Sequence, residues 1–251
     1  MKQTVLITGA ALRIGRAITE HLALRGWDVI VHAHRSTAEA DALCAQLRAD
    51  GHSAWRVGGD LAEEDGADAV FDAAVRAAGR VDALVNNAAC FRRQPLADAT
   101  VDDFEHLWRL NALTPMRLTQ RLARHLSERG ASGCAVQLLD QRIAGAAAPG
   151  IAPYLISKKA LEAFTLSAAL EFAPSLRVNA VAPGAVLAPV SHDAREPAGA
   201  FPLGARPTPE HVAEAVAYLL GARSVTGQIL FVDGGQHVLS QPFTPSQGNK
   251  T

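Results

Sequence analysis

The sequence of 251 residues contains little cysteine, no surplus of either charge and no long hydrophobic run. Its three cysteines, Cys44, Cys90 and Cys134, are too few and too scattered for a disulfide framework or a metal site, so we expect neither. An odd number of cysteines agrees with a reducing compartment. Cys44 and Cys134 are best explained as small buried side chains.

The two kinds of charge nearly cancel, with 24 Lys and Arg against 25 Asp and Glu. No basic surplus remains to neutralise a phosphate backbone or an anionic membrane, so neither nucleic acid nor a membrane is an expected partner. Residues 1–9 hold one lysine and a short apolar run that Thr8 breaks, unlike a signal peptide. No other stretch approaches the roughly 18 continuous apolar residues of a membrane span. We expect a cytoplasmic protein.

Apolar side chains, by contrast, are abundant: 49% of the residues are hydrophobic and 20% are charged. Such a chain can bury a substantial core, which excludes intrinsic disorder. Without repeats, low-complexity segments or charged linkers, residues 1–251 are predicted to form a single domain. Residues 187–207 carry several prolines and no periodicity, and are either a substrate lid or an irregular connector. Residues 240–251 form a polar C-terminal tail.

Short runs of Val, Ile and Leu alternate along the chain with longer segments of helical period. This rhythm predicts βαβ units around a parallel sheet buried on both faces. The predicted fold is α/β, a Rossmann-like doubly wound sheet of seven strands between two layers of helices. Strands are expected at 4–8, 28–33, 53–57, 83–86, 134–139, 177–182 and 228–232. Helices are expected at 14–25, 38–49, 63–78, 101–126 (two helices), 154–172 and 209–220.

A glycine turn stands directly after the first predicted strand, in Thr8-Gly9-Ala10-Ala11-Leu12-Arg13-Ile14-Gly15. Glycines there let the backbone approach a pyrophosphate at a helix N-terminus, where amide groups and the helix dipole favour an anion. This position favours a dinucleotide site, formed by Gly9, Arg13, Ile14 and Gly15, over an ordinary loop. Arg13 replaces a glycine of the longer glycine pattern. Its planar fork can lie over the diphosphate or meet a ring edge, a solvated arginine being the alternative.

The end of the second predicted strand indicates which dinucleotide binds. An acid there accepts hydrogen bonds from the ribose 2′-OH of NAD, whereas an arginine accommodates the 2′-phosphate of NADP. The chain reads His34-Arg35-Ser36 and has no acid before Glu39. This pattern favours NADPH, with a merely solvated strand end as the alternative. Asp60 and Leu61, after the third strand, are placed to meet the adenine edge.

Further motifs follow the later strands: Asn86-Asn87-Ala88, Tyr154 with Lys158, and Pro183-Gly184. Together with the glycine turn and the late Val232-Asp233-Gly234-Gly235, their order and spacing make residues 4–235 resemble the short-chain dehydrogenase/reductase family. The resemblance implies that Asn87, Ala88, Pro183 and Gly184 line the cofactor. It also implies a homotetramer, assembled through the helices at 101–126 and 154–172.

Tyr154 and Lys158 are the expected reacting pair. Four residues apart on a helix, they share one face, and an ammonium near a phenol moves the pKa of the phenol down toward the working pH. The tyrosine can then pass a proton while the nicotinamide passes a hydride. The resemblance further implies that Lys158 holds the nicotinamide ribose and that Asn111 supports the lysine through water.

The serine that the family usually carries about thirteen residues before the tyrosine is absent, and Asp140 stands in that region. Asp140, Arg13, the His34-Arg35-Ser36 run and Phe91 resemble a narrower branch, the pteridine reductases and dihydromonapterin reductases. This likeness implies that Phe91 stacks on a pterin that Arg13, Asp140 and Tyr154 also contact. A carboxyl beside the tyrosine can relay the proton that a ring C=N bond needs on its nitrogen.

The spacing of this carboxyl departs from the pattern, since Asp140 lies fourteen residues before Tyr154. Either the loop holds one extra residue, or Gln141 fills the serine site. The sequence favours an NADPH-dependent reductase of a C=N bond in a pterin, dihydropterin or dihydrofolate-like substrate. A carbonyl reductase of 3-oxoacyl thioesters or ketones needs only Tyr154 and Lys158. A non-catalytic NADPH-sensing protein is the third reading, against which the intact Tyr154, Lys158 and Asn111 speak.

Overall fold

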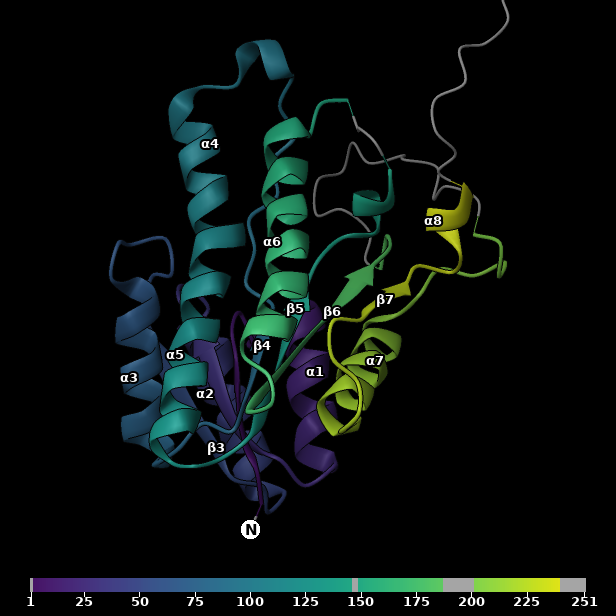
Figure 1. The fold of residues 1–251 in the computed structure, drawn as a ribbon. Coiled ribbons are helices and arrows are strands. Elements are labelled where there is room, and N and C mark those ends of the chain that lie inside the picture. The colour runs from purple at the N-terminus through teal and green to yellow at the C-terminus, as the bar shows by residue number, and fades with distance from the viewer. Residues whose placement is uncertain (1, 146–148, 187–200, 240–251) are drawn as a thin grey trace, which may run out of the picture.

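The computed structural model describes residues 2–145, 149–186 and 201–239 (Figure 1). The strands are β1 Thr4–Ile7, β2 Asp28–Ala33, β3 Ala54–Gly58, β4 Ala83–Asn86, β5 Gly133–Leu138, β6 Leu176–Pro183 and β7 Ile229–Val232. The helices are α1 Arg13–Leu24, α2 Thr37–Ala49, α3 Gly66–Ala78, α4 Val101–Trp108, α5 Thr114–Glu128, α6 Ala152–Glu171, α7 Pro209–Gly221 and α8 Gln236–Leu239. Three short helical turns are η1 Leu96–Asp98, η2 Arg109–Leu113 and η3 Gln141–Ala144.

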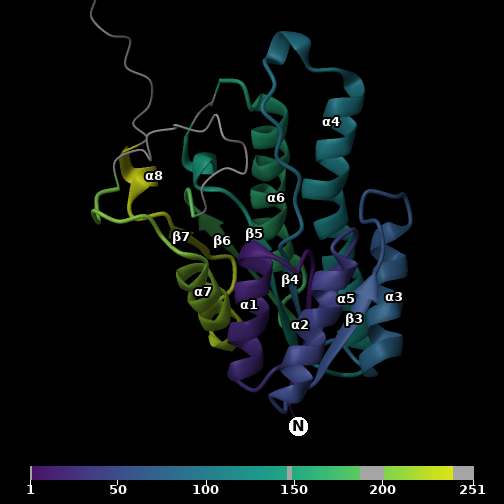
Figure 2. The same cartoon turned by 180° about the vertical axis from the view of Figure 1, so that it is seen from behind.

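All the strands pair in parallel, in the order β3-β2-β1-β4-β5-β6-β7. Helices α1, α2 and α7 cover one face of the sheet, and α3, α5 and α6 cover the other, as the two opposite views show (Figures 1 and 2). The predicted doubly wound α/β fold is confirmed. No helix in the described ranges is both long and apolar enough to cross a membrane.

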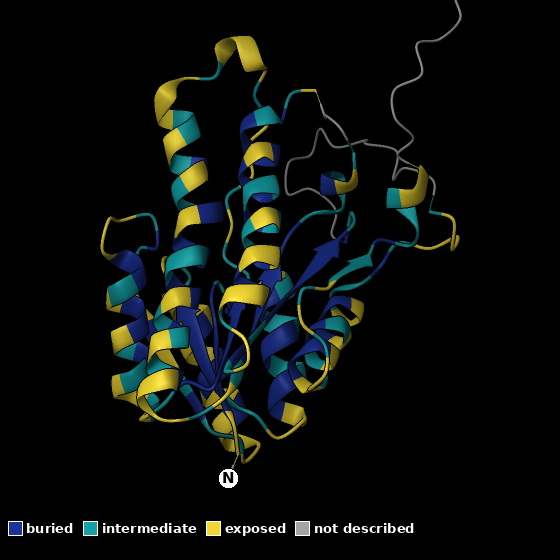
Figure 3. Ribbon diagram, in the orientation of Figure 1, coloured by how far each residue is buried: buried dark blue, intermediate teal, exposed yellow. Residues whose placement is uncertain are grey.

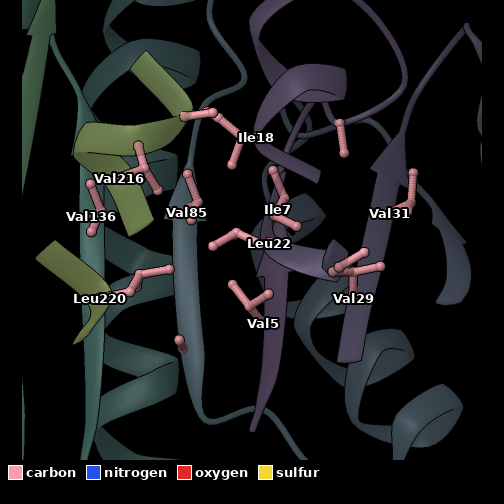
Figure 4. Packing of buried hydrophobic residues seen from close by; sticks show 14 of the residues in the cluster. Val5, Ile7, Ile18, Leu22, Val29, Val31, Val85, Val136, Val216 and Leu220 are labelled. Atoms are coloured by element: carbon pink, nitrogen blue, oxygen red, sulfur yellow. The ribbon is translucent and has the colours of Figure 1, made fainter. Parts of the chain in front are cut away.

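Covering both faces explains why the strands are mainly apolar, and Figure 3 shows most of the central strands as buried and β7 as intermediate. Along β1, Val5 and Ile7 pack under α1, whereas Leu6 belongs to the cluster on the other face. Figure 4 shows Val5 and Ile7 beside Ile18 and Leu22 of α1. Successive side chains of a strand thus enter opposite cores, as the two-residue period of a strand requires.

The predicted strands all occur, with ends that differ by one residue at most, and the helix ends differ by up to three residues. The largest shift is in α3, which begins at Gly66 rather than Glu63. A Cβ at Gly66 would lie 2.1 Å from the Asp60 carbonyl oxygen, so the chain folds tightly there before the helix starts. Helix α6 begins at Ala152 with a proline in its first turn, where no N–H is needed.

The predicted helix pair at 101–126 is joined by a π-helical turn, η2, between α4 and α5. Pro115 in the first turn of α5 has no N–H to donate, which favours a change in the hydrogen-bond ladder here. The inserted turn contains Asn111, whose side chain is fully buried. Sequence periodicity does not reveal such a turn, because it adds only one residue to a helix.

The strand order reverses between β1 and β4, which lie side by side in the sheet. In an open parallel sheet, ligands bind outside the carboxyl ends of the strands at this switch point. The motifs after β1, β2, β3, β4, β5 and β6 therefore meet at one edge of the sheet. The fold places the candidate site at that edge.

Leu22 and Leu24 test the packing of α1, because they lie on the same helix with 0% and 77% exposure. We expect Leu22→Ala to lower the free energy of unfolding by about 2–5 kcal/mol, through lost burial and a cavity under the helix. Leu24→Ala, the matched control, should change it by no more than about 0.5 kcal/mol. Urea unfolding at one protein concentration measures both. Equal losses would contradict the orientation of α1 described here.

Candidate active site

The glycine turn after β1 is shaped by two close approaches of the backbone. Gly9 has a φ of 61°, in the left-handed region that favours glycine. A Cβ on Gly15 would lie 2.1 Å from the carbonyl oxygen of Gly9, so no side chain fits there. The first turn of α1 consequently packs directly on the loop, and its free N–H groups face the switch point.

Asn87, which follows β4, ties this turn to the neighbouring strand. Its amide nitrogen donates to the carbonyl oxygens of Thr8 and Gly9, each at 2.9 Å. The Thr8 hydroxyl in return accepts the backbone N–H groups of Asn87 and Ala88 at 3.0 Å. The residues predicted to line the cofactor on β1 and β4 are therefore joined into one hydrogen-bonded unit.

His32 is a member of this unit that the sequence motifs do not assign. Its Nδ1 accepts the backbone N–H of Gly9 at 3.2 Å, and its Nε2 lies 3.1 Å from the carbonyl oxygen of Gly59. Burial lowers the pKa of His32 to about 4. The ring is therefore neutral, accepts at Nδ1 and donates at Nε2, and links β2 to the loops after β1 and β3. The only sequence signal is a histidine that directly follows the apolar run Val29-Ile30-Val31 of β2.

Arg13 is exposed and has a φ of 55°, the left-handed conformation that disfavours side chains. Among the described non-glycine residues, no other has a positive φ. The conformation costs roughly 1–2 kcal/mol relative to the right-handed form. Glycine in the longer family pattern avoids this cost, and Arg13 places a guanidinium at the start of α1 instead.

The predicted adenosine end is formed by the loops after β2 and β3. Nδ1 of His34 lies 3.5 Å from Oδ1 of Asp60. Arg35 is exposed and Ser36 directly precedes α2. Leu61 is buried and its carbonyl oxygen accepts the Thr114 hydroxyl at 2.7 Å, which fixes the loop on α5. The structure thus brings these predicted residues to one end of the site.

The predicted Pro183-Gly184 pair lies at the end of β6. Pro183 is the last residue of the strand, and Gly184 is the first residue after it. Gly184 donates its N–H to Val232 of β7 at 3.0 Å. Most of the predicted lid, residues 187–200, and the predicted tail, 240–251, lie outside the described residues. The last part of the lid is described, and Leu203 donates to the Gly234 carbonyl oxygen at 3.1 Å.

Tyr154 and Asp140 meet beyond the end of β5. The Tyr154 hydroxyl donates to Oδ2 of Asp140 at 2.9 Å, with both side chains largely withdrawn from solvent. Gln141 begins η3 and makes no such contact with the tyrosine. Of the two alternatives left by the spacing, Asp140 is therefore the residue that faces the hydroxyl. The family's usual serine is replaced by a carboxylate at this contact.

Phe91 forms a wall beside the hydroxyl. Its ring meets the Tyr154 ring edge to face, with centroids 4.9 Å apart and planes at 83°. Phe91 is 47% exposed, so much of the ring is open to a ligand. The loop that carries it is held by Asn111, which bonds both the N–H and the carbonyl oxygen of Cys90 at 2.8 Å.

Lys158 lies fully within the protein on the same helix as Tyr154. Its ammonium donates to the Leu138 carbonyl oxygen at 2.7 Å. Asn111 contacts Ser157 at 3.2 Å in addition to Cys90, and support of Lys158 through water stays a prediction. Asn111 thus joins the loop after β4 to α6, the helix that carries the expected reacting pair.

Burial has opposite effects on the two reacting groups. It raises the pKa of the Tyr154 hydroxyl well above its ordinary value, and the Asp140 carboxylate raises it further. It lowers the pKa of Lys158 to about 8, against a smaller raising effect of Asp140. The prediction that Lys158 lowers the pKa of Tyr154 is wrong for this arrangement. The ammonium donates to a carbonyl oxygen, while the hydroxyl faces an anion.

Residues 9–237 match the protein family described as Enoyl-(Acyl carrier protein) reductase. A protein of Streptomyces violaceoruber named as a ketoacyl reductase of the granaticin polyketide synthase is 36% identical over 93% of this chain and 96% of its own length. Pteridine reductase 1 of Leishmania tarentolae is 33% identical over 92% of this chain and 94% of its own. The crystal structure of FolM Alternative dihydrofolate reductase 1 from Brucella canis, complexed with NADP, superimposes with a TM-score of 0.89 at 32% identity, covering 98% of each chain.

These similarities extend over nearly the whole chain and include proteins with different substrates. The chain belongs to the short-chain dehydrogenase/reductase family and is an oxidoreductase of that family. Its relatives include both pterin and ketoacyl reductases by name, so membership alone leaves the substrate open.

The buried ammonium of Lys158 is expected to lower the stability of the folded protein. At pH 7 we expect Lys158→Met to raise the free energy of unfolding by about 2 kcal/mol, because burying the charge costs more than its hydrogen bond returns. The folded-state pKa of about 8 lies below the ordinary 10.5, so the wild-type protein loses this cost as pH rises between the two values. The gain should therefore be full below pH 8 and shrink toward pH 10.5.

Unfolding by urea at pH 7 and at about pH 10 measures this gain. Lys159→Met is the matched control, since the neighbouring lysine is only partly buried. A Lys158→Met protein less stable than the wild type at pH 7 would contradict the inferred cost of the buried charge.

Proposed function

We propose that this protein is an NADPH-dependent reductase of a C=N bond in a pterin, dihydropterin or dihydrofolate-like substrate. The observation that carries the proposal is the 2.9 Å hydrogen bond from the Tyr154 hydroxyl to the Asp140 carboxylate. A hydroxyl at this place suits a carbonyl oxygen, whereas a carboxylate suits delivery of a proton to a ring nitrogen. The similarity to FolM and to pteridine reductase 1 supports the same substrate class.

The residues around the switch point fit NADPH. Gly9 and Gly15 let the turn pack closely against the start of α1, where the N–H groups of Ile14 and its neighbours would bind a diphosphate that Arg13 could also reach. Exposed Arg35, with Ser36 and His34 beside it, is free to accept a 2′-phosphate, while Asp60 and Leu61 border the adenine. Asn87, Ala88, Pro183 and Gly184 would line the nicotinamide end of the cofactor, whose ribose Lys158 would bind. NADPH, when bound, supplies a hydride.

The protein's own residues handle the proton. A hydride added to the carbon of a C=N bond leaves a pair of electrons on nitrogen, which must take up one proton. The raised pKa of Tyr154 keeps its hydroxyl protonated at neutral pH, so it can give that proton. Asp140, hydrogen-bonded to the hydroxyl, is the group through which a proton from solvent returns to the phenolate.

The residues around Tyr154 and Asp140 orient the substrate. Phe91 presents an open ring face next to Tyr154, on which a flat heterocycle can stack. Arg13, exposed at the start of α1, offers a planar donor fork to the other end of the ring system. Asn111 acts indirectly by holding the loop that carries Phe91.

Carbonyl reduction is the second candidate, and one observation favours it. Tyr154 and Lys158 lie on one face of α6 at the site, and these two groups are sufficient for reduction of a ketone or a 3-oxoacyl thioester. The similarity to the ketoacyl reductase of Streptomyces violaceoruber supports this candidate.

NADPH oxidation by the purified protein tests the two candidates. Dihydrobiopterin, dihydromonapterin and folate are compared with an acetoacetyl thioester, and NADH serves as the weaker cofactor. We expect turnover of a pterin, with kcat/KM lowered on the order of 10²-fold or more in Asp140→Ala, because the proton relay is lost. Asp140→Ser, which restores the family's usual residue, should keep less pterin activity than thioester activity.

Turnover of the thioester alone, unaffected by Asp140→Ala, would refute pterin reduction and leave carbonyl reduction standing. NADPH binding without turnover of any substrate would favour the sensing protein. In that case Tyr154→Phe should leave its biological activity intact.

We also propose a homotetramer assembled through α4, α5 and α6. Large apolar side chains are exposed on α4, on η2 at the start of α5, and on α6, namely Val101, Trp108, Leu113, Ile156, Leu166 and Leu170. An apolar groove between α4 and α6 is lined by Phe104, Trp108, Pro153 and Ile156. Exposed apolar surface of this kind is typical of an interface between subunits.

Light scattering should give four times the chain mass of 26.4 kDa. Leu170→Glu, at a position 82% exposed on α6, should lower that mass because it would bury a charge in the interface. Leu24→Glu is the matched control on the opposite face, at 77% exposure, and should leave the mass unchanged. A wild-type mass of one chain would refute the assembly.

A further inference from the structure

Arg142 belongs to η3 and lies two residues after Asp140. Its Nη1 is 3.1 Å from Oδ2 of Asp140, and its backbone N–H donates to Oδ1 at 2.9 Å. Oδ2 is the same oxygen that accepts the Tyr154 hydroxyl. The carboxylate therefore receives three donors, and two of them come from Arg142.

The guanidinium of Arg142 also reaches the aromatic wall. Its Cζ lies 5.7 Å from the centroid of the Phe91 ring, within the range of a cation–π contact. Phe91 in turn meets Tyr154 edge to face. The four side chains form a closed cycle of contacts, from Arg142 to Asp140, Tyr154, Phe91 and back to Arg142.

This cycle fixes how the carboxylate meets the hydroxyl. The backbone N–H of Arg142 holds Oδ1, and the guanidinium adds a charged donor on Oδ2, the oxygen that accepts the Tyr154 hydroxyl. The side chain of Asp140 is 14% exposed and that of Arg142 is 31% exposed, so solvent screens their ion pair only in part. The half-exposed Phe91 ring thereby contacts Arg142 as well as Tyr154.

We propose that Arg142 is a positioning residue that holds the Asp140 carboxylate against the Tyr154 hydroxyl and the Phe91 ring beside both. The proton donor and the surface on which the flat substrate stacks are thereby fixed relative to one another. The inference rests on the proposed function for its substrate, and extends it to a residue outside the family motifs. Arg142 acts through Asp140 and Phe91 and needs no contact with the reacting atoms.

Titratable and charged groups from four segments face this centre. Asp140 and Arg142 come from the loop after β5 and from η3, Tyr154 and Lys158 from α6, and Cys90 from the loop after β4. A cation beside the pair favours the deprotonated form of the donor. Removing only the Arg142 cation should therefore raise the pKa of the Tyr154 hydroxyl, which is the proton donor. The alkaline limb of the pH profile of kcat should then move to higher pH.

The test is a double-mutant cycle with Arg142→Met and Asp140→Asn, followed by kcat, KM and the pH profile of kcat. We expect Arg142→Met to lower kcat about tenfold or more, since misplacing a reacting group by 1 Å has effects of this size. In the Asp140→Asn background the same substitution should have little further effect on kcat. The hydrogen bond from the Arg142 backbone N–H to Oδ1 of residue 140, which caps the N-terminus of η3, can form in every variant.

Arg142→Lys keeps the positive charge but loses the planar guanidinium with its fixed donor geometry. We expect it to restore the wild-type position of the alkaline limb and to recover kcat only in part. This variant also serves if Arg142→Met fails to fold. Arg56→Met is the matched control, because Arg56 forms a 2.7 Å ion pair with Asp41 on the protein surface, and it should leave kcat unchanged.

The proposal is overturned if Arg142→Met lowers kcat equally in the wild-type and Asp140→Asn backgrounds, or if the alkaline limb does not move. Running the cycle with a dihydropterin and with an acetoacetyl thioester separates this failure from that of the proposed function. Turnover of the thioester alone refutes pterin reduction, while the cycle measured on it still tests Arg142. Absence of turnover with both substrates would overturn both proposals, since no proton transfer would remain to be positioned.

Discussion

The parallel hydrogen-bond ladder of the seven strands is the constraint on which the candidate site depends. Parallel strands need crossover helices, and these cover both faces of the sheet and bury its side chains. All carboxyl ends then meet at one edge, so residues far apart in the sequence become neighbours. Thr8 and Asn87 share hydrogen bonds across the switch point for this reason, although 79 positions separate them.

Two hydrogen-bonded units share that edge, and they differ in charge. The unit around Gly9 is held by neutral groups, including an imidazole whose burial lowers its pKa to about 4. The backbone N–H groups of Gly9 and Ala10 are already bonded to His32, so an anion at this unit would be bound by the N–H groups of the first turn of α1. The unit around Asp140 holds an anion with two charged or polar partners, Arg142 and Tyr154. One unit suits binding of a diphosphate, and the other suits movement of a proton.

Several residues of the site are locally unfavourable. Arg13 has a left-handed backbone conformation, and Lys158 buries an ammonium whose pKa falls to about 8. Folding stability alone would favour glycine and an apolar side chain at these positions. Such features persist where the surrounding packing holds them and are concentrated at functional sites. They mark the same edge of the sheet that the motifs indicate.

The sequence by itself determined the order of strands and helices, because apolar runs and helical periods report burial directly, and it determined which residues end at the carboxyl edge. It also singled out Asp140, yet left open whether Gln141 takes its place, since loop length does not specify loop conformation. Only the tertiary structure decided that Asp140 faces Tyr154 and that Lys158 turns to Leu138. It also decided that His32 belongs to the unit around Gly9 and Arg142 to the unit around Asp140. Those contacts depend on distances between distant segments, and the pKa values follow from burial that no local pattern encodes.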